Sequence, residues 1–319
     1  MTSQTLLQRI TFDLGVPVPT LRRLARSAPH RYKVFTIAKR SGSGMRVIAQ
    51  PAKEVKAVQR WLVEKEFLRL PKHAAATAYG AGCSILDNAQ RHQNGRFLLK
   101  LDFQNFFPSI KEMDLRAHVA KHLPERYTEA DITLICRFCL WYPPGSRDLE
   151  LCIGAPSSPI LSNSIMYDFD IAVSSYCTIA GIVYSRYADD LAFSTSRPDI
   201  LTAVPRVIRE LLINAPYPTL RLNEQKAVYT SKKFRRSVTG LVISSQGAVS
   251  LGRARKRIIR SMLHWFIMGK LASEECGKLR GLIAFSEDVE PDFVRRLEAH
   301  YSKATLDKVR QYRILRGGK

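Results

Sequence analysis

The chain has 319 residues, 45% of them hydrophobic, which is enough to bury a sizeable core in one or two domains. Its 50 lysines and arginines outnumber 28 aspartates and glutamates, so the formal net charge is +22 and we expect a polyanionic partner, most commonly nucleic acid. No apolar run is long enough to span a membrane, and the start MTSQTLLQRITFDLGV has no secretory signal, so we expect a cytoplasmic protein without a membrane partner.

The six cysteines are expected to be reduced thiols in that compartment. Cys136 and Cys139 form a C-x-x-C pair inside an apolar, helix-like run, and no second pair follows at zinc spacing. We therefore predict that both are core thiols rather than metal ligands.

The first third of the chain is expected to contain helices and a basic hairpin. Residues 1–30 are helix-like and include the basic stretch PTLRRLARSAPHR. Alternating apolar residues in 32–51 predict two strands around a Ser-Gly-Ser-Gly tip, with Pro51 ending the second strand. Apolar residues at helical spacing then predict a helix over 53–70, which Pro71 ends.

The middle of the chain alternates strand and helix patterns. RFLLKLD, residues 96–102, predicts a short strand that ends in an acid. Ser109 and Glu112 have the S-x-x-E spacing of a capping box, so we predict one helix from Pro108–Ser109 to about Leu123. Another apolar helix is expected at about 128–142, and the small-residue loop GAPSSP leads into a helix near Pro159–Leu161.

The rest of the chain predicts a hairpin, short strands and a helical end. SRYADDLAFST, residues 185–195, predicts the hairpin, and a helix follows at about 199–213. TLRLN and SVTGLVIS are strand-like, and from Gly252 onward basic and apolar residues occupy opposite sides of a long helix. The pattern is α+β, with a central antiparallel sheet, a basic N-terminal portion and a helical C-terminal portion.

Asp189 and Asp190 are adjacent acids in a stretch that otherwise favours a strand, where aspartate is disfavoured. Their side chains converge only if 188–190 form a tight hairpin tip, and an ordinary turn is the alternative explanation because turns favour aspartate. Asp102 ends the strand FLLKL and would meet both acids if the two strands are neighbours in one sheet. Three such carboxylates would bind a pair of Mg²⁺ ions suited to in-line phosphoryl displacement, although spacing alone does not establish that the strands are adjacent.

The motifs resemble those of reverse transcriptases, and most closely the retron-type reverse transcriptases of bacteria. The resemblance covers residues from about 30 to 290 and runs, in the family's order, through MRVIAQP, SILDNAQRH, LDFQNFFPS, GAPSSPILSN, RYADD, LNEQK and VTGLVIS. Tyr-x-Asp-Asp alone is a weak pattern, but seven motifs in order are a specific signal. The resemblance implies a right-hand polymerase with an N-terminal helical extension at 1–30, fingers at 31–95 and 110–160, a palm at 96–109 and 161–250, and a helical thumb at 251–319.

The resemblance also implies roles for the palm residues. Asp102, Asp189 and Asp190 would be the carboxylates around two Mg²⁺ ions, for which Mn²⁺ can substitute, and the carbonyl of Phe103 would complete one site. Phe107 corresponds to the bulky residue beneath the incoming sugar and would favour dNTPs, although either Phe106 or Phe107 must serve the core. Lys226, in LNEQK, corresponds to a lysine that protonates leaving pyrophosphate, which requires a depressed pKa.

Nucleotide contacts are implied for the hairpin and for the small-residue loop. Arg46 corresponds to a fingers arginine that grips the triphosphate, with Lys33 and Lys39 expected nearby, and solvated surface charges are the alternative. The loop formed by Gly154, Ala155 and Pro156 would let a nucleotide or template strand approach the backbone closely. Ile153 replaces the polar residue, often glutamine, that the family usually carries, so no polar contact is expected there.

Two further stretches point to retrons within the larger family. NAQRH puts Asn88 and His92 on one helical face, and Val238, Thr239 and Gly240 form a VTG element, and both are implied to engage a cognate structured RNA. A lone histidine is more often an ordinary core or surface group. The basic helix resembles a thumb that tracks the template–product duplex through phosphate contacts from Arg253, Arg255, Lys256, Arg257 and Arg260.

The implied function is an RNA-directed DNA polymerase that copies part of a retron noncoding RNA into single-stranded DNA, starting from a 2′-hydroxyl and leaving a branched RNA–DNA product. Phage defence with a separate effector protein is also implied, and template removal is expected from a host ribonuclease H. Alternatives are a group II intron or diversity-generating reverse transcriptase, against which NAQRH and VTG argue, and a catalytically silent RNA-binding scaffold, against which the clustered acids argue. The sequence does not indicate the oligomeric state.

Overall fold

The computed structural model of the chain describes residues 4–39, 44–80 and 82–313. The chain divides into two compact units, one made of Met1–Cys83 with Leu99–Tyr229 and the other of Ser84–Leu98 with Thr230–Lys319. Both helices and sheets are present, as the α+β prediction requires. Within the described ranges, none of the helices combines the length and the apolar character needed to cross a membrane.

The first unit begins with helices and a hairpin. In the hairpin, β1 and β2 are antiparallel, with Tyr32 opposite Pro51 and Ala38 opposite Met45, so this prediction is confirmed. Its predicted tip includes residues that lie outside the described ranges, at 40–43. The elements up to this point and the helix that follows are α1 (Leu6–Leu14), α2 (Val18–Ser27), η1 (Ala28–His30), β1 (Tyr32–Ala38), β2 (Met45–Pro51), α3 (Lys53–Lys65) and η2 (Phe67–Arg69).

The single helix predicted from Pro108–Ser109 to about Leu123 is wrong, because the segment forms α5 (Phe106–Ser109) and α6 (Glu112–His122). Ile110 between them is extended and its carbonyl accepts from the Leu151 N–H at 3.0 Å. This pairing with a distant segment outweighs local helix propensity. The cap of α6 comes from Asp114, whose carboxylate accepts from the Lys111 N–H at 2.7 Å, and not from the predicted Ser109.

The next helices are close to their predicted positions, except that the single helix predicted from near Pro159 is divided at Met166 into two. They are α7 (Glu129–Cys139), α8 (Ser158–Ile165), α9 (Tyr167–Ala180) and, after the 3-10 turn η3 (Ile200–Thr202), α10 (Val204–Asn214). Cys136 and Cys139 are buried free thiols in α7, and burial raises the pKa of Cys136 to about 12, as expected for core thiols.

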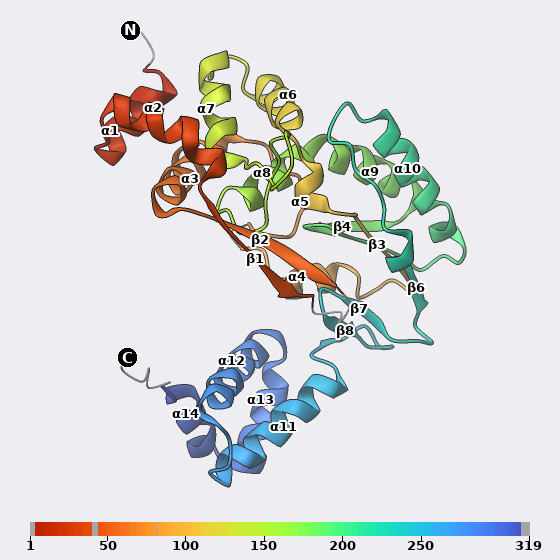
Figure 1. Cartoon of the computed structure of the whole chain (residues 1–319). Helices are drawn as coiled ribbons and strands as arrows, with labels where there is room; N and C mark the ends of the chain where they lie inside the picture. Colours follow the sequence, from red (N-terminus) through yellow and green to blue (C-terminus); the bar gives the residue numbers. More distant parts are fainter. Residues whose placement is uncertain (1–3, 40–43, 81, 314–319) are drawn as a thin grey trace. The chain divides into compact units, whose positions relative to one another are not determined.

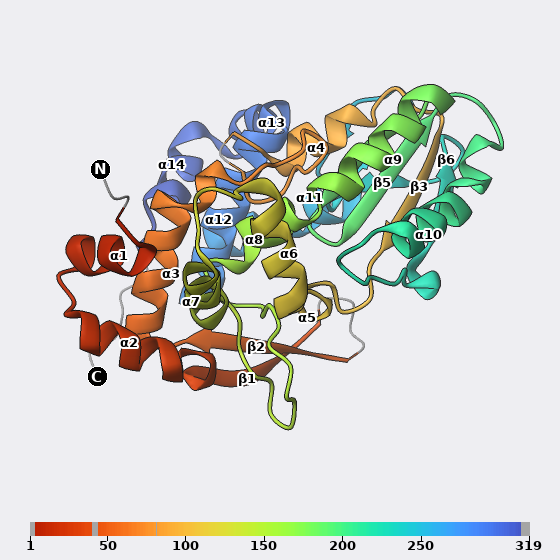
Figure 2. The same ribbon diagram turned by 90° about the horizontal axis from the view of Figure 1, so that it is seen from above.

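A four-stranded sheet with the order β4-β5-β3-β6 lies at the centre of the first unit. Its strands are β3 (Phe97–Asp102), β4 (Val183–Tyr187), β5 (Asp190–Thr195) and β6 (Val228–Ser231). Helices α9 and α10 contact each other and run along one face of this sheet (Figures 1 and 2). TLRLN, predicted as a strand, forms only an isolated bridge between Leu222 and Phe103, so it follows the end of β3 without becoming a strand.

The second unit contains a small sheet, a short helix and a helical bundle. Helix α4 (Ile85–Arg91) contacts the strands of a three-stranded sheet with the order β7-β8-β9. The strands are β7 (Arg236–Val238), β8 (Leu241–Ile243) and β9 (Val249–Ser250). The predicted helical C-terminal portion is confirmed and gathers into one group (Figure 1), formed by α11 (Arg253–Ile267), α12 (Ser273–Val289), α13 (Pro291–Tyr301) and α14 (Lys303–Gln311).

Candidate active site

The two adjacent acids lie at the turn between β4 and β5. Tyr187 pairs with Asp190 across the hairpin, so Ala188 and Asp189 form a two-residue turn and Asp190 begins β5. Ala188 has a φ of 56°, in the left-handed region that non-glycine residues seldom adopt. The tight hairpin tip that the sequence required for convergence of the two acids is therefore present.

A buried ion pair supports this turn from within the unit. Arg186 is fully buried, and its Nη1 donates to the Ala188 carbonyl at 3.1 Å. Its Nη2 lies 2.6 Å from Oδ2 of Asp170 on α9, and Tyr184 donates to the other oxygen of that carboxylate at 2.8 Å. Because a buried guanidinium is tolerated only with such partners, this network holds the turn in one conformation.

Our sequence analysis missed Arg186 and Asp170. A signal was available, since a charged residue at an inward strand position beside an acidic turn needs a buried partner. The apolar helix pattern YDFDIAVSSYC contains such an acid at Asp170.

Asp102 reaches the same end of the sheet, because β3 is the neighbour of β5. The N–H of Phe103 donates to the backbone carbonyl of Asp189 at 3.2 Å, which fixes the end of β3 against the turn. The adjacency that spacing alone left open is therefore observed, and Asp102, Asp189 and Asp190 meet at one sheet edge.

The electrostatics of this edge are those of crowded carboxylates. Desolvation by the surrounding protein and, after it, repulsion from Asp189 and Asp102 together raise the pKa of Asp190 to about 7, although Asp190 keeps an exposed edge. The pKa of Asp189 is raised by burial and then by Asp102. Clustered carboxylate oxygens whose like charges are only partly offset by nearby cations are the donor set that a hard divalent cation prefers, so the residues present fit Mg²⁺.

Lys226 lies beside Asp102 in the short turn η4 (Glu224–Lys226). Its Nζ is 2.8 Å from Oδ2 of Asp102, and this bond raises the pKa of Lys226. The direction is opposite to the depression that we expected of a general acid. In this arrangement the ammonium instead neutralises part of the acidic cluster.

The two phenylalanines after Asp102 differ in environment. Phe106 is buried and stacks on Phe103 with ring centroids 5.7 Å apart. Phe107 is only partly buried and meets Phe106 edge-on at 5.4 Å. Phe106 therefore serves the core, which leaves Phe107 as the more exposed of the two rings.

Arg46 and Lys33 occupy different parts of the hairpin. Arg46 is exposed, and its charge partly offsets the raised pKa of Asp189. Arg46 pairs with Ile37, whereas Lys33 pairs with Gln50, four residues away or roughly 13 Å at about 3.3 Å per residue. Contrary to our expectation, Lys33 does not lie beside Arg46, and it lines an open depression of about 540 Å³ together with Arg31, Lys53 and Lys56.

The small-residue loop contacts the hairpin. Gly154 has a φ of 122°, and a Cβ at this position would lie 2.8 Å from the carbonyl oxygen of Ala49. The Ala49 N–H donates to the Ile153 carbonyl at 2.9 Å, while Ala155 is buried and Pro156 partly buried. The close backbone approach expected of this loop is thus made to β2 of the same unit.

The two predicted RNA elements lie together in the second unit. Asn88, His92 and Val238 are buried, and burial lowers the pKa of His92 to about 4, so this imidazole is neutral at physiological pH. Thr239 Oγ1 donates to the Ile85 carbonyl at 3.0 Å, and Gly240 is exposed. Only the turn formed by Thr239 and Gly240 faces solvent, so the buried members can only position it.

The five basic residues of α11 fall into two groups. Arg253, Arg257 and Arg260 are exposed. Lys256 Nζ lies 2.5 Å from Oε1 of Glu290, and Arg255 stacks over the ring of Phe285 at 5.1 Å. These two side chains stabilise the helical group. Arg260 also lies over a ring, that of Phe293 at 5.4 Å, so Arg253 and Arg257 are the arginines most freely available to a ligand.

Comparison with known proteins agrees with this geometry. Residues 37–243 match the family model described as reverse transcriptase (RNA-dependent DNA polymerase). The chain is 40% identical over 311 residues to the Retron Ec83 reverse transcriptase of Escherichia coli, covering 97% of each chain. It is 32% identical over 305 residues to the Retron Ec86 reverse transcriptase of the same species, covering 92% of this chain and 90% of that one. Telomerase from Candida albicans, solved with a TWJ fragment of telomeric RNA, shares the fold with a TM-score of 0.50 at 11% identity, covering 92% of this chain and 63% of that chain.

The fold and the acidic sheet edge define a right-hand polymerase, and the family match makes it an RNA-directed DNA polymerase that works on nucleic acid. Within that class, the chain belongs to the retron reverse transcriptases.

Proposed function

We propose that this enzyme reverse-transcribes part of a cognate retron noncoding RNA into single-stranded DNA by two-metal nucleotidyl transfer. DNA synthesis starts from a 2′-hydroxyl of that RNA and leaves a branched RNA–DNA product. The observation that carries the chemistry is the meeting of Asp102, Asp189 and Asp190 at one sheet edge. Similarity to retron reverse transcriptases over 97% of the chain supports the choice of template.

In this proposal Asp102 and Asp189 would hold both Mg²⁺ ions, Asp190 would add charge to the site, and the Phe103 carbonyl would complete it. Bound metal supplies charge stabilisation for the attacking and leaving oxygens of the displacement. Mn²⁺ is expected to substitute because it accepts the same oxygen ligands. If a metal took the Asp102 oxygen that Lys226 now contacts, the protonated amine of Lys226 would be free to face the leaving pyrophosphate.

The remaining palm and fingers residues select and hold the nucleotide. Phe107, the more exposed of the two rings, excludes a 2′-hydroxyl and so favours dNTPs. Arg46 grips the triphosphate from the hairpin, and Lys39, which directly follows the end of β1 and is two residues beyond Ile37, is better placed than Lys33 to assist. The fingers, palm and thumb keep the borders proposed from the sequence.

Recognition of the RNA is assigned to the second unit. The Thr239–Gly240 turn contacts the cognate RNA, and Asn88 and His92 hold its shape from the core. The exposed arginines of α11 grip the template–product duplex through its phosphates, which predicts strongly salt-dependent binding. A separate effector protein, a role in phage defence and template removal by a host ribonuclease H complete the proposal.

The test is the Asp189→Asn variant, assayed for Mg²⁺-dependent dNTP incorporation on a primed RNA. We expect incorporation to fall below detection while RNA affinity changes less than about twofold, since the neutral amide removes a metal ligand but no phosphate contact. Asp148→Asn, at an exposed loop acid, is the matched control and should polymerise normally. Continued synthesis by Asp189→Asn would refute the assigned chemistry.

Analysis of the copurified nucleic acid distinguishes the proposed retron function from the alternative functions. Nucleic acid that copurifies with the enzyme from its host should be a small branched RNA–DNA. An intron RNA would indicate a group II type enzyme instead. Bound RNA without attached DNA, from an enzyme that also fails to extend primers, would indicate a silent scaffold.

A further inference from the structure

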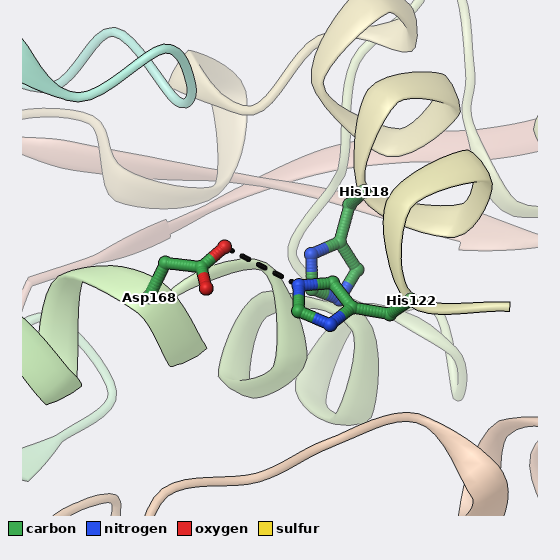
Figure 3. Close-up of side chains that lie close together, drawn as sticks. All are labelled: His118, His122 and Asp168. Atoms are coloured by element: carbon green, nitrogen blue, oxygen red, sulfur yellow. Dashed lines mark hydrogen bonds and ion pairs between the residues drawn. The ribbon is translucent and has the colours of Figure 1, made fainter.

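A second group of metal-ligand side chains lies between α6 and α9 of the first unit (Figure 3). His118 and His122 are one helical turn apart on α6, and Asp168 lies in the first turn of α9. Their ligand atoms are all within 4.8 Å of one another. None of the three belongs to the acidic edge described above.

The three side chains already converge without a metal. His122 Nε2 lies 3.2 Å from Oδ2 of Asp168, and the His118 and His122 rings have centroids 4.5 Å apart. In a tetrahedral site with bonds of about 2.1 Å, ligand atoms lie roughly 3.4 Å apart. Side-chain rotations that shorten the separations between ligand atoms by up to about 1.4 Å would therefore complete a site.

The chemistry of the group favours a zinc-type ion over magnesium. His118 is buried, and each imidazole of the pair can offer a nitrogen lone pair to a metal. Two imidazoles and one carboxylate are a familiar zinc donor set, whereas Mg²⁺ prefers oxygen ligands and water. The acidic edge and this group thus select different metals.

Outer partners are also in place, as metal-bound histidines require. Ser164 Oγ lies 2.6 Å from Nε2 of His118, and the Tyr217 hydroxyl lies 3.4 Å from its Nδ1. Whichever ring nitrogen binds a metal, the other has a partner that fixes the ring.

One charged group competes with a metal for the site. Lys121 Nζ lies 2.8 Å from the same Asp168 oxygen that faces His122. The lysine side chain is 52% exposed, so it can turn into solvent when a cation takes its place. The competing explanation is a hydrogen-bonded cluster that serves packing alone.

We propose that His118, His122 and Asp168 bind one divalent transition-metal ion of the zinc type, which ties α6 to the start of α9. This site is independent of the polymerase metals. It leaves a fourth coordination position for water.

The experiment uses tag-free full-length protein, stripped of metal and titrated with Zn²⁺ in excess Mg²⁺, so that the acidic edge is already saturated. A Cys83→Ser background removes the exposed thiol that would compete for zinc. We expect one equivalent of Zn²⁺ by calorimetry, a higher Tm, and visible absorption of four-coordinate Co²⁺ when cobalt replaces zinc. His122→Gln and Asp168→Asn should each weaken binding about 100-fold or more, beyond what loss of an outer partner causes.

Three further variants make the result decisive. Lys121→Ala should tighten zinc binding by removing the competing cation, and it does not disturb the core. His300→Gln, at an exposed histidine of α13, should leave zinc binding unchanged. Asp189→Asn should also leave it unchanged, because the acidic edge is not the zinc site. Absence of zinc binding in the parent protein, unchanged affinity in His122→Gln and Asp168→Asn, or loss of binding in Asp189→Asn would each overturn the proposal.

Discussion

The β4–β5 turn and the β7–β8 turn each consist of two residues between antiparallel strands. Each begins with a non-glycine residue of positive φ, Ala188 at 56° and Thr239 at 48°. The first strand of each hairpin also carries a buried arginine, Arg186 in one and Arg236 in the other. The two hairpins share a local plan but hold turns of very different charge.

The partners of the two arginines differ in the same way as the turns. Arg186 pairs with the carboxylate of Asp170, which more than offsets burial and raises the pKa of the guanidinium. Arg236 donates to the carbonyls of Gly95 and Ser244, and burial lowers its pKa. A turn that must keep like charges together is held by a full ion pair, whereas hydrogen bonds to neutral carbonyls suffice for the uncharged turn.

Among the variants that test the difference between the two hairpins, Asp170→Leu should have the largest effect. It leaves Arg186 buried without its counter-charge, so we expect a loss of about 3–5 kcal/mol in the free energy of unfolding, measured in urea, together with loss of polymerisation. The double variant Asp170→Leu with Arg186→Met should regain most of the stability. It should not regain activity, because the Ala188 carbonyl still lacks its donor. Restored activity in the double variant would mean that the pair does not position the acids.

Arg236→Met applies the matching change to the uncharged hairpin. It removes a donor from two carbonyls, and we expect a smaller loss of about 1–3 kcal/mol in the free energy of unfolding, measured in urea. Primer extension on a generic RNA should persist at temperatures where the variant is folded. A loss as large as that of Asp170→Leu would show that the two arginines contribute equally to the free energy of unfolding.

The pH dependence of metal binding should distinguish the two turns without mutation. The pKa of Asp190 is raised to about 7, so below that pH Mg²⁺ must displace a proton. The half-saturating Mg²⁺ concentration should therefore rise up to about tenfold per pH unit below 7 and level off above it, measured by primer extension between pH 6 and 8.

The raised pKa of Asp190 also predicts how the stability of the metal-free protein depends on pH. The folded carboxylate holds its proton more tightly than the unfolded one, whose pKa is 3.8, so unfolding free energy should fall as the pH rises from about 4 to about 7. Binding of the cognate RNA in EDTA is the control. The Thr239–Gly240 turn contains no acid. We therefore expect that this turn causes no change in RNA affinity as the pH passes through about 7.

The smallest expected effect is that of Thr239→Val. It removes the hydrogen bond to the Ile85 carbonyl and should lower the free energy of unfolding by about 1 kcal/mol. Affinity for the cognate RNA should fall about fivefold, as measured by filter binding, while affinity for a generic primer–template stays the same. Equal losses on both ligands would argue against a specific role for this turn.

Local patterns in the sequence were enough to predict much of this molecule. The hairpin of 32–51, the strand ending at Asp102 and the acidic turn all follow from alternation and turn chemistry over a few residues. The break at Ile110 was not predictable, because it depends on backbone bonds to residues 149–151 that no local pattern reveals. Spacing could not separate Lys33 from Arg46 either, since only the register of the hairpin does so.

The sequence predicted the residues of the candidate site better than it predicted their burial and the contacts that support them. An i, i+4 pair such as Asn88 and His92 indicates a shared face but not what covers it, and here that face is buried. The support from Arg186 and Asp170 depends on the packing of α9 against β4, which the sequence shows only as two charges in apolar stretches.

The contact between Gly154 and the Ala49 carbonyl has a mechanical consequence. It leaves no space for even a methyl group, and the neighbouring Ala49 N–H is bonded to Ile153 as well. The strand that carries Arg46, β2, and the loop that leads into α8 are therefore in tight backbone contact, and we expect them to move together. A displacement of Arg46 on triphosphate binding would be transmitted to the loop before α8. Gly154→Ala should weaken this coupling while leaving every charged residue in place.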